Sequence, residues 1–168
     1  MSLNLNEQEE RVLVTGASGF IATHIVKLLL EEGFRVRGTV RDLSNVKKVN
    51  PLKSLALNAK FELELCEADL LNANSWSNAV KDCTCVIHTA SPFPNEIPRD
   101  EADLIGPAVN GTLNVLKACV NEHSKVKRVI LTSSVAAVSG AVFENGRIFS
   151  EKDWPDLKIQ TAYAKRFF

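Results

Sequence analysis

The sequence lacks the features that would place it in a membrane, outside the cell or on nucleic acid. Its 20 basic and 20 acidic side chains cancel, whereas a general nucleic-acid-binding protein carries a basic excess. No apolar run approaches the roughly 20 residues that a helix needs to span a bilayer. The first residues, MSLNLNEQEER, are polar and acidic rather than basic and then apolar, so we expect no secretory signal there.

Metal-binding patterns are also missing. The four cysteines lack the paired spacing of a zinc site, and the three histidines are scattered over different predicted elements. We therefore expect no metal site and interpret both residue types as structural: Cys66, Cys83, Cys85, Cys119, His24, His88 and His123. Unpaired thiols are typical of a reducing compartment, which favours a cytoplasmic protein.

The chain is long and apolar enough for one domain with a core. It has 168 residues, of which 45% are hydrophobic, and no internal repeat or linker divides it. We expect a flexible arm over residues 1–10 and a single domain over residues 11–168.

Short apolar strands alternate with helical segments along this domain. Strands are predicted at residues 11–15, 34–40, 61–65, 83–88 and 126–131, and helices at 20–32, 76–81 and 103–122. Pro51 is expected to interrupt any helix that forms after the second strand. Alternating strands and helices indicate right-handed βαβ units. The predicted fold class is therefore α/β, a Rossmann-type doubly wound parallel sheet of about five strands in the order 3-2-1-4-5.

A glycine-containing turn joins the first strand to the first helix. Glycine leaves room for backbone N–H groups and a helix N-terminus to approach an anionic phosphate closely. The spacing of Gly16, Gly19 and Ala22 is G-x-x-G-x-x-A, which differs from the G-x-G-x-x-G fingerprint but still allows close helix–sheet packing. We interpret this turn as a dinucleotide phosphate site; an ordinary strand–helix turn is the alternative.

The end of the second strand indicates which dinucleotide is bound. NAD sites place an acid here for the ribose hydroxyls, whereas a 2′-phosphate calls for arginine. Arg41 comes first and Asp42 second, followed by Lys47 and Lys48. The planar guanidinium makes two parallel charge-assisted hydrogen bonds to phosphate, so we favour NADP over NAD. A solvated basic loop is the alternative interpretation.

Polar or glycine-rich groups follow all five predicted strands. Because ligands bind at the carboxyl edge of an open parallel sheet, these groups should converge on one edge. They are Gly16 to Gly19, Arg41, Asp69, Thr89 to Ser91 and Ser133-Ser134. Their agreement is stronger evidence for a nucleotide site than any single motif.

Several blocks of sequence occur in the order and spacing of a known family. They are VLVTGASGFIATHIVKLLLEEGFRVRGTVRD, CEADL, VIHTASPF, PAVNGTLNVLKAC and RVILTSSVAAVSG. From about Arg11 to Lys165 the chain resembles an extended short-chain dehydrogenase/reductase, within the group of dihydroflavonol, cinnamoyl-CoA and aldehyde reductases. The resemblance implies NADP-dependent reduction of an aldehyde or ketone to an alcohol.

The resemblance also implies roles for individual residues. The pyrophosphate would be held by Gly16, Ser18, Gly19, Phe20 and Ile21, and the 2′-phosphate by Arg41 and Lys48. Asp69 and Leu70 would flank the adenine, and Thr89, Ala90 and Ser91 would line the ribose and nicotinamide side. The catalytic serine is placed at Ser134, with Ser133 as the neighbouring alternative.

The catalytic pair of the family, Tyr-x-x-x-Lys on one helix, is incomplete. The tyrosine supplies a proton to the reduced carbonyl oxygen, and the lysine lowers the tyrosine pKa from its usual value of about 10. Tyr163 occupies the tyrosine position, but Phe167 stands where the lysine is expected. Lys165 lies about 200° around the helix from Tyr163 and does not replace that lysine. We therefore expect little or no turnover from this chain.

Full-length members of the family are considerably longer than this chain. We therefore expect the C-terminal substrate lobe to be absent, as in a truncated product or a partial sequence. Two functions fit: a reductase of small carbonyl compounds with little or no activity in this form, and a non-catalytic NADP-binding or subunit-interaction fragment. The second would self-associate through the sheet edge left open beside the fifth strand. An unstable fragment without function is a third alternative.

Overall fold

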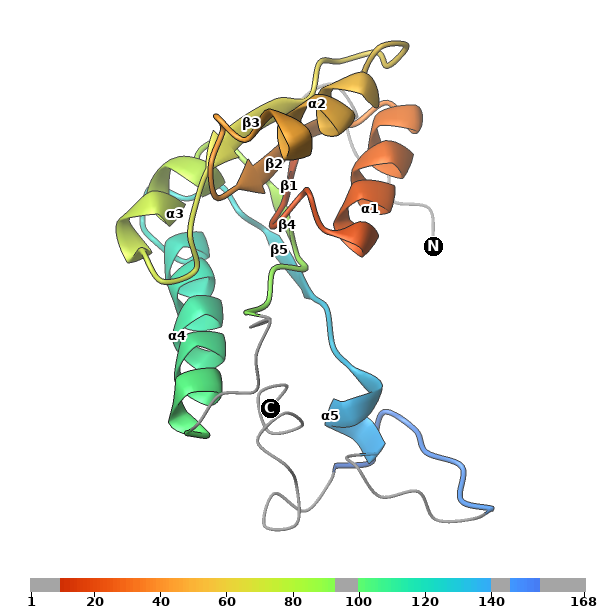
Figure 1. Cartoon of the computed structure of the whole chain (residues 1–168), viewed down its shortest axis with the longest axis vertical. Coiled ribbons are helices and arrows are strands. Elements are labelled where there is room, and N and C mark those ends of the chain that lie inside the picture. Colours follow the sequence, from red (N-terminus) through yellow and green to blue (C-terminus); the bar gives the residue numbers. More distant parts are fainter. Residues whose placement is uncertain (1–9, 93–99, 140–145, 155–168) are drawn as a thin grey trace.

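Five parallel strands form one sheet with helices on both faces (Figure 1). The computed structural model describes residues 10–92, 100–139 and 146–154. The strands are β1 Arg11–Val14, β2 Arg35–Val40, β3 Glu64–Glu67, β4 Cys85–His88 and β5 Arg128–Leu131. The helices are α1 Phe20–Glu31, α2 Val46–Ser54, α3 Ala73–Val80, α4 Ala102–Cys119 and α5 Val135–Ser139. The order β3-β2-β1-β4-β5 confirms the predicted topology.

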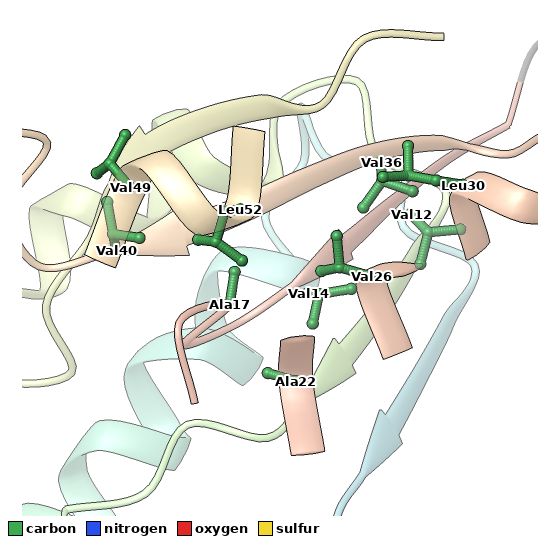
Figure 2. Packing of buried hydrophobic residues seen from close by; sticks show 10 residues of the cluster. All are labelled: Val12, Val14, Ala17, Ala22, Val26, Leu30, Val36, Val40, Val49 and Leu52. Atoms are coloured by element: carbon green, nitrogen blue, oxygen red, sulfur yellow. The ribbon is translucent and has the colours of Figure 1, made fainter. Parts of the chain in front are cut away.

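Helices α1 and α2 cover one face of the sheet through an apolar cluster (Figure 2). Successive strand residues point to opposite faces, so Val12 and Val14 of β1 join this cluster while Leu13 joins another. The buried positions of α1 recur every four residues and lie along one side of the helix: Ala22, Val26 and Leu30. This packing fixes α1, and with it the turn that precedes it, against the sheet.

Helices α3 and α4 contribute to the cluster on the opposite face. It joins Leu13 of β1 and Val86 of β4 to Trp76 of α3 and Val115 of α4. Trp76 is the largest fully buried side chain in the described part of the chain.

Strand β3 begins at Glu64, so the predicted strand at residues 61–65 is misplaced. Its pairing with β2 starts where Arg37 lies opposite Glu64. Before that point the Phe61 ring packs beneath the Arg35 guanidinium, whose carbon lies 4.2 Å from the ring centroid. Alternation alone misplaced the strand because it does not show which residues find a partner.

Pro51 does not interrupt the segment after β2, contrary to the prediction. It lies inside α2, which continues to Ser54. Proline removes one helical hydrogen bond. The helix persists because Val49 and Leu52, on either side of the proline, are buried in the α1–α2 cluster.

Arg37 is a buried charged residue at the centre of β2. Its guanidinium donates to Glu64 of β3 through Nε (2.8 Å) and pairs with the same carboxylate through Nη2 (2.7 Å). Nη1 donates to the C=O groups of Ala79 (2.9 Å) and Lys81 (2.6 Å) at the end of α3. Arg37 thus satisfies carbonyls that a helix end leaves without an internal partner.

The predicted arm lies outside the described residues except for Glu10. Among the helices that the structure describes, none has the length and apolarity needed to cross a membrane. The described residues contain no group of three or more His, Cys, Asp or Glu side chains placed to hold a metal ion. The four cysteines are free thiols.

Candidate functional site

The turn between β1 and α1 is organised around Gly16. This residue has a φ of 64°, a left-handed conformation that glycine adopts without a steric penalty. Its N–H donates to the Thr39 hydroxyl (2.9 Å), and its C=O accepts the N–H of Gly19 (2.8 Å). Ala17, fully buried, donates its N–H to the Thr39 C=O (2.8 Å). The end of β2 therefore holds the turn from one side.

The N-terminus of α1 opens from this turn. Gly19 is the N-cap residue and supplies no side chain to cap the helix. The first N–H groups of a helix have no acceptor within it, so those of Phe20 and Ile21 are directed out of its N-terminal end. Both side chains are turned to solvent, with 83% and 59% of their surface exposed. Backbone donors and the helix dipole together favour an anion here.

Two glycines keep this space open. A Cβ at Gly16 would lie 3.2 Å from the Ala90 Cβ, and a Cβ at Gly19 would lie 3.2 Å from the Gly16 carbonyl oxygen. Both approaches are closer than ordinary van der Waals contact. We call the surface formed by Gly16, Gly19 and the N-terminus of α1 the cradle. It is lined by backbone, and a side chain larger than that of glycine at either position would fill it, so these residues fit the pyrophosphate of a dinucleotide.

The segment after β4 lies against the same turn. Thr89 and Ala90 donate their N–H groups to the Thr15 hydroxyl oxygen (3.1 and 3.0 Å). The Thr89 hydroxyl donates to the Thr15 C=O (2.5 Å). These bonds bring Thr89 and Ala90 together with Gly16, and Ser91 follows them on the surface.

His88, the last residue of β4, is buried beside Thr15. Its Nδ1 lies 2.8 Å from the Thr15 hydroxyl oxygen. Burial lowers the pKa of His88 to about 4, so the imidazole is neutral at pH 7. The sequence-based interpretation of His88 as structural did not include this contact with the residue before the glycine turn.

Acid should destabilise the chain through His88. An unfolded histidine has a pKa of about 6.5. Because the folded pKa is about 4, the unfolded state binds the proton first, and stability is lost as the pH falls from 6.5 towards 4. Between pH 7 and pH 5 this group alone should cost about 2 kcal/mol. Urea unfolding of the His88→Asn variant, which has no imidazole to protonate, should show a correspondingly smaller pH dependence; an equal dependence would contradict the assignment.

The segment after β2 exposes Arg41 and engages Asp42 in a local turn. Asp42 Oδ1 accepts the Ser44 hydroxyl (2.6 Å) and N–H (2.8 Å), and these hydrogen bonds lower the pKa of the carboxyl. Arg41 follows β2 directly, and Lys48 lies in the first turn of α2; both side chains are exposed. Because Asp42 is used within its own turn, the arrangement favours Arg41 as the ligand-binding group at this strand end.

The segment after β3 is held by hydrogen bonds from two helices, α3 and α4. Trp76 Nε1 of α3 donates to the Asp69 C=O (2.9 Å). Asn114 of α4 donates its amide to the Leu70 C=O (2.8 Å). The Leu70 side chain lies against Gly111, where an added Cβ would be 2.8 Å from the leucine Cβ. Asp69 and Leu70 are therefore fixed by the α3–α4 layer.

Ser134 follows β5 and caps α5, a helix that the sequence did not predict. Its hydroxyl accepts the N–H of Ala136 (3.2 Å). Two residues earlier, Thr132 donates its N–H to the His88 C=O (3.0 Å), which holds the start of this segment beside β4. The other predicted catalytic residue, Tyr163, lies outside the described residues, as does Phe167, which stands where the family has its lysine.

The strand register places the predicted groups at one edge. Val14 at the end of β1 pairs with Gly38 of β2 and Ile87 of β4, so the segments that follow these strands leave the sheet on the same side. Hydrogen bonds and close contacts bring together the glycine turn and the Thr89–Ala90 segment. Among the described residues, no hydrogen bond joins this group to three other predicted positions: Arg41, Lys48 and Ser134.

Sequence reasoning missed the side chains that hold the turn from beneath. The Thr15 and Thr39 hydroxyls carry no periodic signal, because buried threonines are common in strands. Gly38 did give a signal in the sequence, because a glycine within an apolar strand indicates a close backbone approach. A Cβ at Gly38 would lie 2.7 Å from the Ala17 Cβ, which confirms that β2 and the turn are in direct contact.

Comparison with known proteins identifies the family. Residues 12–166 match the sequence profile of the NAD dependent epimerase/dehydratase family. The chain belongs to this family. Within the family it is 49% identical to cinnamoyl-CoA reductase CAD2 of Medicago truncatula over 128 residues, which cover 76% of this chain and 39% of the relative. It is 44% identical to dihydroflavonol 4-reductase of Arabidopsis thaliana over 152 residues, covering 90% and 39%.

Solved structures agree with this epimerase/dehydratase assignment. Gre2 from Candida albicans in complex with NADPH matches with a TM-score of 0.80 and 31% identity, covering 94% of this chain and 49% of Gre2. Vestitone reductase from alfalfa (Medicago sativa) matches with a TM-score of 0.70 and 34% identity, covering 94% and 48%. The chain therefore spans about two fifths to one half of the length of these relatives. The predicted resemblance to reductases of this family is confirmed.

Proposed function

We propose that the chain binds NADPH as the cofactor-binding part of a reductase of aldehydes or ketones. The observation that carries the proposal is the cradle formed by Gly16, Gly19 and the uncapped N-terminus of α1, closed on one side by Ala90. The similarity to Gre2, which is solved with NADPH, and to plant reductases supports the same cofactor and reaction class. NADP is proposed over NAD because Arg41 is exposed at the end of β2 while Asp42 is engaged with Ser44.

Each part of the dinucleotide has its own proposed residues. Backbone groups of the glycine turn and α1 would hold the pyrophosphate, and two basic side chains the 2′-phosphate. The proposed set is Gly16, Ser18, Gly19, Phe20 and Ile21 for the pyrophosphate, Arg41 and Lys48 for the 2′-phosphate, Asp69 and Leu70 for the adenine, and Thr89, Ala90 and Ser91 for the ribose and nicotinamide side. They lie within one domain, proposed to begin at residue 11.

When bound, NADPH supplies a hydride for the carbonyl carbon of a small-molecule substrate. The Ser134 hydroxyl is proposed to polarise the carbonyl oxygen by donating a hydrogen bond to it, and Tyr163 to donate the proton. This role is supported by the bond from the Thr132 N–H, two residues before Ser134, to the His88 C=O at the end of β4. We infer a cytoplasmic setting from the four free thiols.

Arg41→Ala should weaken NADPH binding selectively. Loss of a charge-assisted hydrogen bond to the 2′-phosphate is expected to raise the Kd for NADPH about tenfold, whereas the Kd for NADH, which lacks this phosphate, should not change. Calorimetric titration of both cofactors measures the two constants. Lys53→Ala is the matched control, since it removes an exposed positive charge from the last turn of α2. Equal effects on NADPH and NADH would contradict the assignment, and absence of NADPH binding at millimolar cofactor would refute the proposed function.

A second function is self-association through the edge of the sheet. In the described part of the chain β5 pairs with β4 alone, and Ile130 and Leu131 on it are 48% and 53% exposed. An apolar edge strand is a template for pairing with another chain. Sedimentation should therefore show concentration-dependent association that Ile130→Lys reduces. The control is Val120→Lys, an apolar position at the C-cap of α4 that is exposed as well. A monomer at all concentrations would exclude this function.

A further inference from the structure

One hydroxyl group, that of Thr15, makes three of the contacts between the carboxyl ends of β1 and β4. Thr15 Oγ1 accepts the N–H groups of Thr89 and Ala90 and lies 2.8 Å from Nδ1 of His88. A threonine hydroxyl has two acceptor lone pairs and one proton. Both lone pairs and the proton of the Thr15 hydroxyl have a partner here, so the orientation of the hydroxyl is fixed.

The direction of the third bond follows from the other two. Because both lone pairs of Thr15 Oγ1 face N–H groups, its proton is the one directed at His88. Nδ1 of His88 is therefore the acceptor, which places the ring proton on Nε2. The low pKa of this imidazole keeps the ring neutral at pH 7, with one ring proton, as this arrangement requires.

His88 connects two parts of the site that the chain separates. Its ring bonds to the residue before the glycine turn, and its C=O accepts the N–H of Thr132 in the segment that leads to Ser134. Its side chain and that of Thr15 are buried, with 2% and 0% exposure, so water does not compete for either group. Between β1 and β4 the strand order reverses, and open α/β sheets bind ligands at this point.

We propose that His88 is a positioning residue for the cofactor. By accepting the Thr15 proton, it holds the two Thr15 lone pairs on the N–H groups of Thr89 and Ala90, and so keeps that segment against the glycine turn. Ala90 is thereby held close to Gly16, where an added Cβ would lie 3.2 Å from the Ala90 Cβ. The expected effect of His88 on NADPH affinity rests on the proposed function. Its effect on the position of Thr89 and Ala90 rests only on the hydrogen bonds described above.

Two substitutions at His88 separate hydrogen bonding from packing. His88→Leu fills the space without an acceptor, whereas His88→Asn keeps an acceptor near the position of Nδ1. The Kd for NADPH, measured below the melting transition of each variant, should rise about tenfold in H88L and less than about threefold in H88N. Amide exchange of Thr89 and Ala90 should accelerate in H88L. Thr84→Val is the matched control because the Thr84 hydroxyl lies on the same β1–β4 seam, at its opposite end.

A double substitution tests whether His88 acts through Thr15. In the Thr15→Val background, H88L should leave the Kd and the exchange rates unchanged, because the hydroxyl that it orients is already gone. Additive effects would overturn the inference, as would unchanged exchange of Thr89 and Ala90 in H88L. Equal loss of affinity in H88N and H88L would show a packing role and would also overturn it. If the unmodified chain binds no NADPH, the proposed function fails, while faster exchange in H88L still supports the positioning role and unchanged exchange overturns it.

Discussion

Replacing Gly16 by alanine should weaken NADPH binding by at least about tenfold and lower the melting temperature. An alanine would be held at a φ of 64°, which costs roughly 1–2 kcal/mol for a residue with a Cβ. Its Cβ would also lie 3.2 Å from the Cβ of Ala90 and 3.3 Å from its Cα, so the wall of the cradle has to move. Calorimetric titration and thermal unfolding measure the two effects.

Gly33→Ala is the matched control for this experiment. Gly33 has a φ of 80°, but a Cβ there would meet only the flexible Lys60 side chain at 3.7 Å. Gly33→Ala should lose stability through its positive φ alone, and so less than Gly16→Ala, and it should keep its affinity for NADPH. If Gly16→Ala binds NADPH as tightly as the unmodified chain, the cradle is not the pyrophosphate site.

Trp76→Ala should cost about 4 kcal/mol of unfolding free energy. Trp76 is 1% exposed and belongs to the α3–α4 cluster. Truncating a buried aromatic side chain to alanine typically lowers the free energy of unfolding by about 3–5 kcal/mol. The variant also loses the hydrogen bond from Nε1 to the Asp69 C=O (2.9 Å). Since whole domains have stabilities of about 5–15 kcal/mol, the variant should be partly unfolded at 37 °C. Urea denaturation followed by circular dichroism measures the loss.

Trp154 provides the matched control, because it is 75% exposed. Trp154→Ala should change the unfolding free energy by less than about 0.5 kcal/mol. Trp76→Phe keeps most of the packing but removes the N–H donor, so it should fall between the two, at a loss of about 1–2 kcal/mol. Similar losses in Trp76→Ala and Trp154→Ala would show that the α3–α4 cluster does not stabilise the fold.

The sequence predicted the topology because the signals that define it are local. Apolar runs alternate with helical spacing, and each βαβ unit has one allowed handedness. The same signals predicted a site at the strand ends, from the glycine turn to Ser134, and that site stays a prediction. The predictions were wrong where strand pairing or burial determines the bounds of an element. Strand β3 starts at Glu64 because that residue pairs with β2. Helix α2 continues through Pro51 because the residues on either side of the proline are buried.

The contacts within the site were less predictable than its location. Thr15 was predicted as the last residue of the first strand, and His88 as a structural residue. Nothing local in the sequence places an imidazole of β4 2.8 Å from the Thr15 hydroxyl. That distance depends on which strands become neighbours and on their register. The α5 helix was missed for a different reason: it has only five residues, and its first turn depends on capping by Ser134.

Arg37 has a consequence for the outermost strand of the sheet. A strand at an edge is bonded on one side only and ordinarily frays before the interior of a domain opens. For β3 to separate from β2, the Arg37 guanidinium must release Glu64, the side chain that β3 contributes to it. The same guanidinium caps the last turn of α3, so edge and helix are expected to unfold locally as one cooperative unit. The Asp69 segment, which connects these two elements, is thereby protected from fraying at both of its ends.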